Sequence, residues 1–110
     1  MTVQIKGKPY ATVAERVSAA HAAGGFSILA TDVLALGGDG GRLYVKVQIE
    51  YNRRRYIGLS EVPRSGKPGS PEATAPLEVA ETSALGRALA FAGFGVDGSI
   101  ASADEMRRVG

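Results

Sequence analysis

A nine-residue alternation in the middle of the chain constrains the fold more than any other feature of the sequence. From Leu43 to Tyr51, apolar or aromatic side chains at every second position are separated by more polar ones. This period of two is typical of a strand that buries one face and exposes the other. Residues 55–62 alternate in the same way after a short turn at residues 52–54. The two runs therefore predict an antiparallel β-hairpin.

A helix and a further strand are predicted before this hairpin. Thr12 and Glu15 form a capping-box pattern, in which each side chain can satisfy a backbone amide at the start of a helix. We expect the helix over residues 13–23, because the glycines that follow it terminate helices readily. The apolar run at residues 26–36 is bounded by glycines and predicts a strand, with a flexible turn at residues 37–41.

A proline-rich loop and a second helix are predicted after the hairpin. Residues 63–76 contain four of the five prolines of the chain, which predicts a flexible surface loop or a locally disordered segment. The apolar periodicity that follows predicts a long helix over residues 77–92, and a capping box at Ser102 and Glu105 predicts a short terminal helix. The resulting fold class is a single α+β domain over residues 1–110, with an antiparallel three-stranded sheet packed by one long helix.

The long helix is apolar on two sides. A stripe of small residues lies beside the broad apolar face and comprises Val79, Ser83, Gly86 and Ala90. A helix that is apolar on two sides is buried on two sides. We expect a second subunit to pack on the small-residue stripe, although the N-terminal helix could cover it within one chain. Glu81 falls inside the apolar arc, where it would need a polar partner.

Most catalytic and cofactor chemistry lacks the residues that it requires. The chain of 110 residues has no cysteine and only one histidine, His21, and none of its apolar runs is long enough to span a bilayer. The N-terminus lacks the apolar segment of a secretory signal, so we expect a cytoplasmic protein. Gly93–Gly98 matches G-x-G-x-x-G but follows a helix instead of a strand. The sequence predicts no enzyme, no cofactor and no metal site.

The basic residues are concentrated around the hairpin. Residues 42–67 hold seven basic and two acidic side chains, although the net charge of the whole chain is only +2. Arginine binds phosphate in bidentate fashion, and tyrosine offers a stacking face to any base. We therefore predict single-stranded nucleic-acid contacts, with an ordinary arginine-rich turn as the alternative. The candidate DNA-binding residues are Tyr44, Lys46, Arg53, Arg54, Arg55, Tyr56, Arg64, Lys67 and Arg87.

The C-terminal third resembles a phage protein family. The segments ETSALGRALAFAGFG (81–95) and SIASADE (99–105) are similar to single-stranded-DNA-binding, strand-annealing recombination proteins related to the essential-recombination-function (Erf) group. The resemblance implies a β-β-β-α core, ring or filament homo-oligomers that need no ATP, and DNA held in a basic groove. It also implies a DNA contact for Arg87. Eukaryotic relatives in the wider annealing superfamily have several basic residues on this helix, whereas this chain has only Arg87 there.

Two functional hypotheses follow. The first is ATP-independent binding of single-stranded DNA that promotes strand annealing in phage recombination or replication. A phage exonuclease or replication protein would be the partner, and the host cytoplasm the location. The second is an oligomeric structural or interaction protein whose basic hairpin docks an acidic protein partner.

Overall fold

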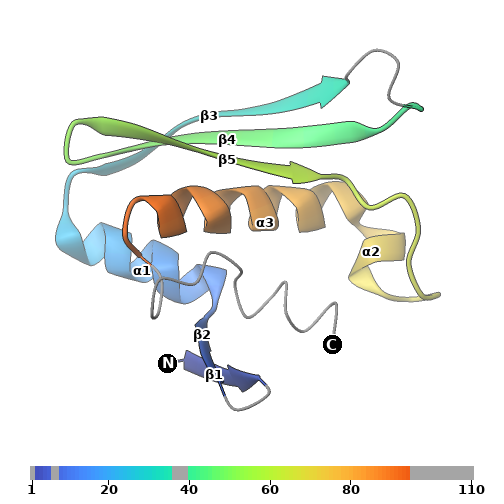
Figure 1. Cartoon of the computed structure of the whole chain (residues 1–110), viewed down its shortest axis with the longest axis horizontal. Coiled ribbons are helices and arrows are strands. Elements are labelled where there is room, and N and C mark those ends of the chain that lie inside the picture. Colours follow the sequence, from blue (N-terminus) through green and yellow to red (C-terminus); the bar gives the residue numbers. More distant parts are fainter. Residues whose placement is uncertain (1, 6–7, 36–39, 95–110) are drawn as a thin grey trace.

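The computed structural model describes residues 2–5, 8–35 and 40–94, and for residues 2–11 it describes only the course of the backbone (Figure 1). The described elements are β1 (Thr2–Ile5), β2 (Lys8–Ala11), α1 (Val13–Ala23), β3 (Phe26–Ala35), β4 (Leu43–Tyr51), β5 (Arg54–Glu61), α2 (Pro71–Thr74) and α3 (Pro76–Phe91). The predicted terminal helix at residues 103–109 lies outside the described residues.

The central layer is an antiparallel sheet of three strands in the order β3-β4-β5, with α3 packed along one face (Figure 1). This α+β arrangement confirms the predicted fold class. Thr12 caps the helix as predicted, since the Glu15 amide donates to Thr12 Oγ1 over 3.1 Å. One element was not predicted, because β1 and β2 pair into a separate two-stranded hairpin before α1.

The turn between β4 and β5 is tighter than the sequence predicted. Tyr51 pairs directly with Arg54, so the turn consists of only Asn52 and Arg53. Both residues have positive φ, 54° and 66°. Two-residue hairpins favour this left-handed backbone because its twist matches that of the strands. Arg54 therefore belongs to the strand and not to the turn.

Strand β3 contains a β-bulge. Ile28 pairs with Ile49 and Ala30 pairs with Gln48, so Leu29 is an extra residue without a counterpart in β4. Bulges are common on edge strands, where they bend the strand and change which residues face each side. After the bulge, Thr31 faces the same side of the sheet as Ile28, because it pairs with Val47.

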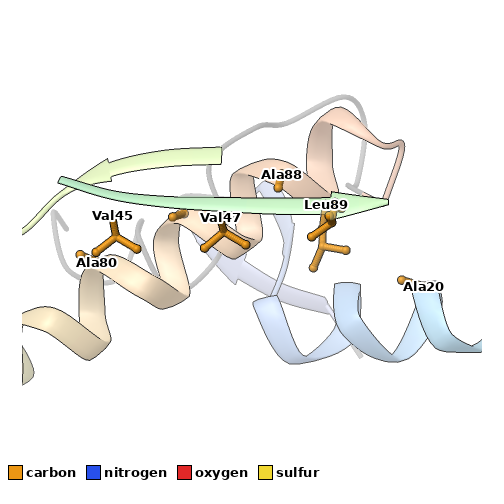
Figure 2. Packing of buried hydrophobic residues seen from close by; sticks show 8 residues of the cluster. Ala20, Val45, Val47, Ala80, Ala88 and Leu89 are labelled. Atoms are coloured by element: carbon orange, nitrogen blue, oxygen red, sulfur yellow. The ribbon is translucent and has the colours of Figure 1, made fainter. Parts of the chain in front are cut away.

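The core lies between the sheet and α3. Alternate residues of β4, namely Val45, Val47 and Ile49, are at most 1% exposed, and Figure 2 shows Val45 and Val47 pointing toward α3. The helix approaches β5 so closely at Gly58 that a Cβ there would overlap the Ala84 carbonyl oxygen. Small residues on the helix and a glycine on the strand thus set the distance between the two layers.

Helix α1 packs on α3, and three of the four residues of the small-residue stripe are buried without a second subunit, contrary to the expectation. Val79, Ser83 and Gly86 are buried within the single chain. Arg16 of α1 is 1% exposed, and its Nη1 donates to the Gly86 carbonyl oxygen over 2.8 Å.

Two further expectations are corrected. Glu81 is exposed, so its carboxylate faces solvent and needs no buried partner. The segment at residues 63–76 is not a plain loop, because Pro71–Thr74 forms the one-turn helix α2. The Ser70 carbonyl oxygen accepts from the Thr74 hydroxyl over 2.9 Å, and Pro71 occupies the first turn, where its missing amide proton costs nothing.

Candidate nucleic-acid interface

Three parts of the fold lie together at one end of the molecule. They are the β4–β5 turn at Asn52 and Arg53, the α1–β3 junction at Gly24 and Gly25, and the end of α3 (Figure 1). Gly25 lies beside the turn, since a Cβ on it would be 3.8 Å from the Asn52 amide nitrogen. We call this region, with the side chains described below, the tip end.

Two edge-on ring pairs lie side by side at the tip end. The Tyr51 and Phe94 ring centroids are 4.8 Å apart with an interplanar angle of 75°, and those of His21 and Phe26 are 5.0 Å apart at 81°. Tyr51 and Phe26 are Cα partners across β4 and β3, which brings the two pairs together. His21 is exposed, and the other three rings are half-buried.

Further aromatic side chains lie close to these pairs. Phe91 is 54% exposed on the last turn of α3, and Tyr56 lies two residues beyond Arg54 on β5. Tyr56 packs partly against the core, on the helix side of the sheet, which limits the ring face that it can offer. Among the described side chains, Tyr44 is the one tyrosine or phenylalanine located elsewhere.

Three exposed arginines surround the same end. Arg53 occupies the turn, and Arg54 pairs with Tyr51 on the side of the sheet that faces α3. Arg55 pairs with Glu50 on the opposite, outer face of the sheet. Successive strand residues point to opposite faces, so the three guanidinium groups spread around the tip. A cluster of this kind can hold phosphates, while the adjacent rings stack with bases.

The outer face of the sheet, which α3 does not cover, is balanced in charge. Its cations are Arg42, Lys46 and Arg55, and its acids are Asp32, Glu50 and Glu61. Lys46 lies directly opposite Asp32, and Arg55 lies directly opposite Glu50. Arg42 Nε is 3.8 Å from Glu61 Oε2. Opposite charges at cross-strand positions attract one another, so this face offers little net positive potential to a polyanion.

The structure divides the nine candidate residues into separate groups. Arg53, Arg54, Arg55 and Tyr56 meet at the tip end, and Tyr44 and Lys46 lie half-buried on the outer face. Arg64 and Lys67 lie exposed beyond the other end of β5, about 25 Å away along an eight-residue strand. Arg87 is half-buried, one turn before the end of α3.

Sequence reasoning missed most of the rings at the tip end. His21, Phe26, Phe91 and Phe94 come from three elements far apart in the sequence, and none was proposed as a contact. The sequence did offer one indication of these rings. Phe26 and Phe94 each directly follow a glycine, at the start of a predicted strand and after the end of a predicted helix. Their meeting depends on the packing of α1 and α3 at the same end of the sheet.

Within residues 2–5, 8–35 and 40–94, no cluster of histidine and carboxylate groups could hold a metal ion. None of the helices in these ranges is long and apolar enough to cross a membrane. Comparison with protein-family models, curated proteins and solved structures found no significant match to this chain.

Proposed function

We propose that the protein binds single-stranded DNA without ATP and promotes the annealing of complementary strands in phage recombination or replication. One observation carries the proposal. Arg53 and Arg54 are exposed and have no acid opposite them in the sheet, and with Arg55 they surround an end of the molecule where partly exposed aromatic rings gather. Arginine and aromatic rings together are the groups that sequence-tolerant single-strand binders use.

A preference for single strands follows from the two kinds of group at the tip end. Rings such as Phe91 can stack only with bases that are not already stacked in a duplex. A duplex offers mainly phosphates, and the charge-balanced outer face adds little attraction for them. Binding by the tip end is therefore expected to favour single strands and to weaken with salt.

Annealing requires more than one tip end. Three arginines neutralise few phosphates, so one subunit binds weakly, and several linked subunits bind far more tightly. We propose a ring or filament of identical subunits, joined by surfaces other than the largely buried small-residue stripe. The protein would act in the cytoplasm of the host cell, beside a phage exonuclease or replication protein, with no catalytic role of its own.

A labelled oligonucleotide tests the binding step. Affinity for the single strand and for its duplex is measured over a salt series with the purified protein. We expect the single strand to bind more tightly, with an affinity that falls steeply as salt increases. Equal affinity for both forms, or no binding at low salt by the folded protein, contradicts the proposal. An annealing assay with complementary strands then tests the second step.

The outer face of the sheet supports a second candidate, an oligomeric structural or interaction protein. Ile57 and Leu59 are 49% and 47% exposed on this face, among balanced charges. Exposed apolar groups within a mixed polar surface are typical of protein contacts. In this case the arginines of the tip end would dock an acidic protein. Assembly without DNA affinity would favour this candidate.

A further inference from the structure

The helix side of β3 is only partly covered. Helix α3 lies over β4 and β5 and leaves the edge strand β3 beyond its reach (Figure 1). Ile28 and Val33 belong to this side, because they pair with the helix-facing Ile49 and Val45. Their side chains are nevertheless 51% and 52% exposed. An edge strand with exposed apolar side chains is a site at which another polypeptide segment can bind.

A groove runs between β3 and the two long helices. Val13, Ile28, Val47 and Leu85 line it with apolar groups, and the exposed Glu81 lies at the same groove. The volume of the groove is about 220 Å³. Small-molecule sites usually hold about 300–1,000 Å³. The groove therefore suits one or two apolar side chains of a peptide better than a cofactor.

The described chain ends close to this groove. Phe94 contacts Tyr51 on the helix side of the sheet, and Tyr51 pairs with Phe26. Ile28 is two residues further along β3, a distance of about 7 Å. Sixteen residues follow Phe94 in the sequence. The first eight of them, up to Ser102, can span about 26 Å when extended, which is more than enough to reach the groove.

The remaining residues have the pattern of a short amphipathic helix. After the capping box at Ser102 and Glu105, Met106 and Val109 recur at helical spacing. Arg107 and Arg108 lie on the polar side of such a helix, from which their long side chains can extend to a carboxylate at the rim of the groove. Methionine adapts its shape to irregular apolar spaces, and a guanidinium group pairs readily with a carboxylate. The segment thus offers chemical groups that match the floor of the groove and Glu81.

We propose that residues 102–109 of the same chain dock in the groove between β3 and α3. Met106 inserts between Ile28 and Leu85, and Arg107 or Arg108 pairs with Glu81. The docked segment would cover the helix side of the edge strand and prevent another chain from using it. This proposal is independent of DNA binding by the tip end.

Paired cysteines test the proposal, because the natural chain contains no cysteine. In the double variant Ile28→Cys, Met106→Cys, mild oxidation should join the two positions within one chain. A disulfide needs Cα atoms about 4.4–6.8 Å apart, so it reports direct proximity. The control is Leu59→Cys, Met106→Cys, whose exposed position 59 lies on the opposite face of the sheet. Circular dichroism checks that both variants are folded.

We expect the Ile28 variant to form the internal disulfide at least about tenfold faster than the control, because docking raises the local concentration of position 106. Equal rates in the two variants would overturn the proposal. A disulfide-linked dimer as the main product would also overturn it, since a second copy would then occupy the groove. Adding Glu81→Arg should slow the internal reaction, and further adding Arg107→Glu and Arg108→Glu should restore it.

Discussion

The tip end and the middle of the sheet both carry cations, yet the two regions differ in what those cations face. In the middle, Lys46 lies opposite Asp32, and α3 packs so closely on Gly58 that no side chain fits there. At the tip end, Arg53 lies in an exposed turn and Arg54 lies opposite Tyr51, an uncharged partner. The cations in the middle of the sheet therefore pair with acids within the fold. These two arginines of the tip end have no such partner across the sheet and can attract a ligand.

This difference shows that a segment rich in basic residues does not necessarily form a basic surface. The segment over residues 42–67 has a strong excess of cations. Antiparallel pairing places acids from β3 and from the hairpin itself beside several of those cations. Only the location of each charge on the sheet decides which of them can attract a polyanion.

The largest expected effect is on stability in the middle of the sheet. Gly58→Ala should lower the free energy of unfolding by about 3 kcal/mol, because the new Cβ overlaps the Ala84 backbone in α3. Leu59→Ala is the matched control, since Leu59 is the exposed neighbour on the outer face and its loss should cost under about 1 kcal/mol. Urea denaturation measures both. Similar losses in the two variants would show that α3 does not pack tightly on β5.

The next effect is on DNA binding at the tip end. Replacing Arg53, Arg54 and Arg55 with alanine should weaken single-strand affinity about tenfold to a hundredfold and lower the salt slope by about two. Stability should change little, because all three side chains are exposed.

The control for this variant removes two cations from the outer face of the sheet. Arg42→Ala with Lys46→Ala should change affinity less than about twofold, because acids on the neighbouring strands already balance these charges. Fluorescence anisotropy over a salt series measures both variants. If the outer-face variant loses as much affinity as the tip variant, the two regions do not differ as proposed.

A smaller effect is expected from a single ring. Tyr51→Leu should weaken binding about fivefold to tenfold, whereas Tyr51→Phe should bind normally because it keeps the stacking face. Tyr51 also contacts Phe94, so thermal unfolding must be followed in both variants to separate binding from packing. Equal loss of affinity in the Leu and Phe variants would instead assign the role to the hydroxyl group.

The smallest effect separates charge from backbone strain in the turn. Arg53 has φ of 66°, a conformation that costs a residue with a Cβ about 1 kcal/mol relative to glycine. Arg53→Gly should therefore raise stability by about that amount while weakening DNA binding about twofold to threefold. Arg53→Ala should weaken binding equally without the gain in stability. Improved binding in the Gly variant would exclude a role for the Arg53 charge.

Local pattern was sufficient for most of the fold. The alternation from Leu43 to Tyr51 identified the central strand, and the capping box at Thr12 identified the start of α1. These signals are readable because each one depends on neighbours within a few residues of sequence. The bulge at Leu29 and the hairpin formed by β1 and β2 lack such signals.

Less of the candidate site could be predicted from local sequence patterns. Arg53, Arg54 and Arg55 are contiguous, so their cluster could be predicted from the chain alone. Phe26 and Phe94 reach them only because α1 and α3 end beside the β4–β5 turn. The pairing of Lys46 with Asp32 depends in turn on the register of two strands.

The sequence by itself determined the order of the main elements, the buried face of β4 and the contiguous cations of the hairpin. The physical reason is that these properties follow from local periodicity, capping and chain connectivity. Only the tertiary structure decided that α1 contacts the small-residue stripe at Gly86, that acids balance the outer face and that rings gather at the tip end. Each of these depends on contacts between segments far apart in sequence, which no local pattern encodes.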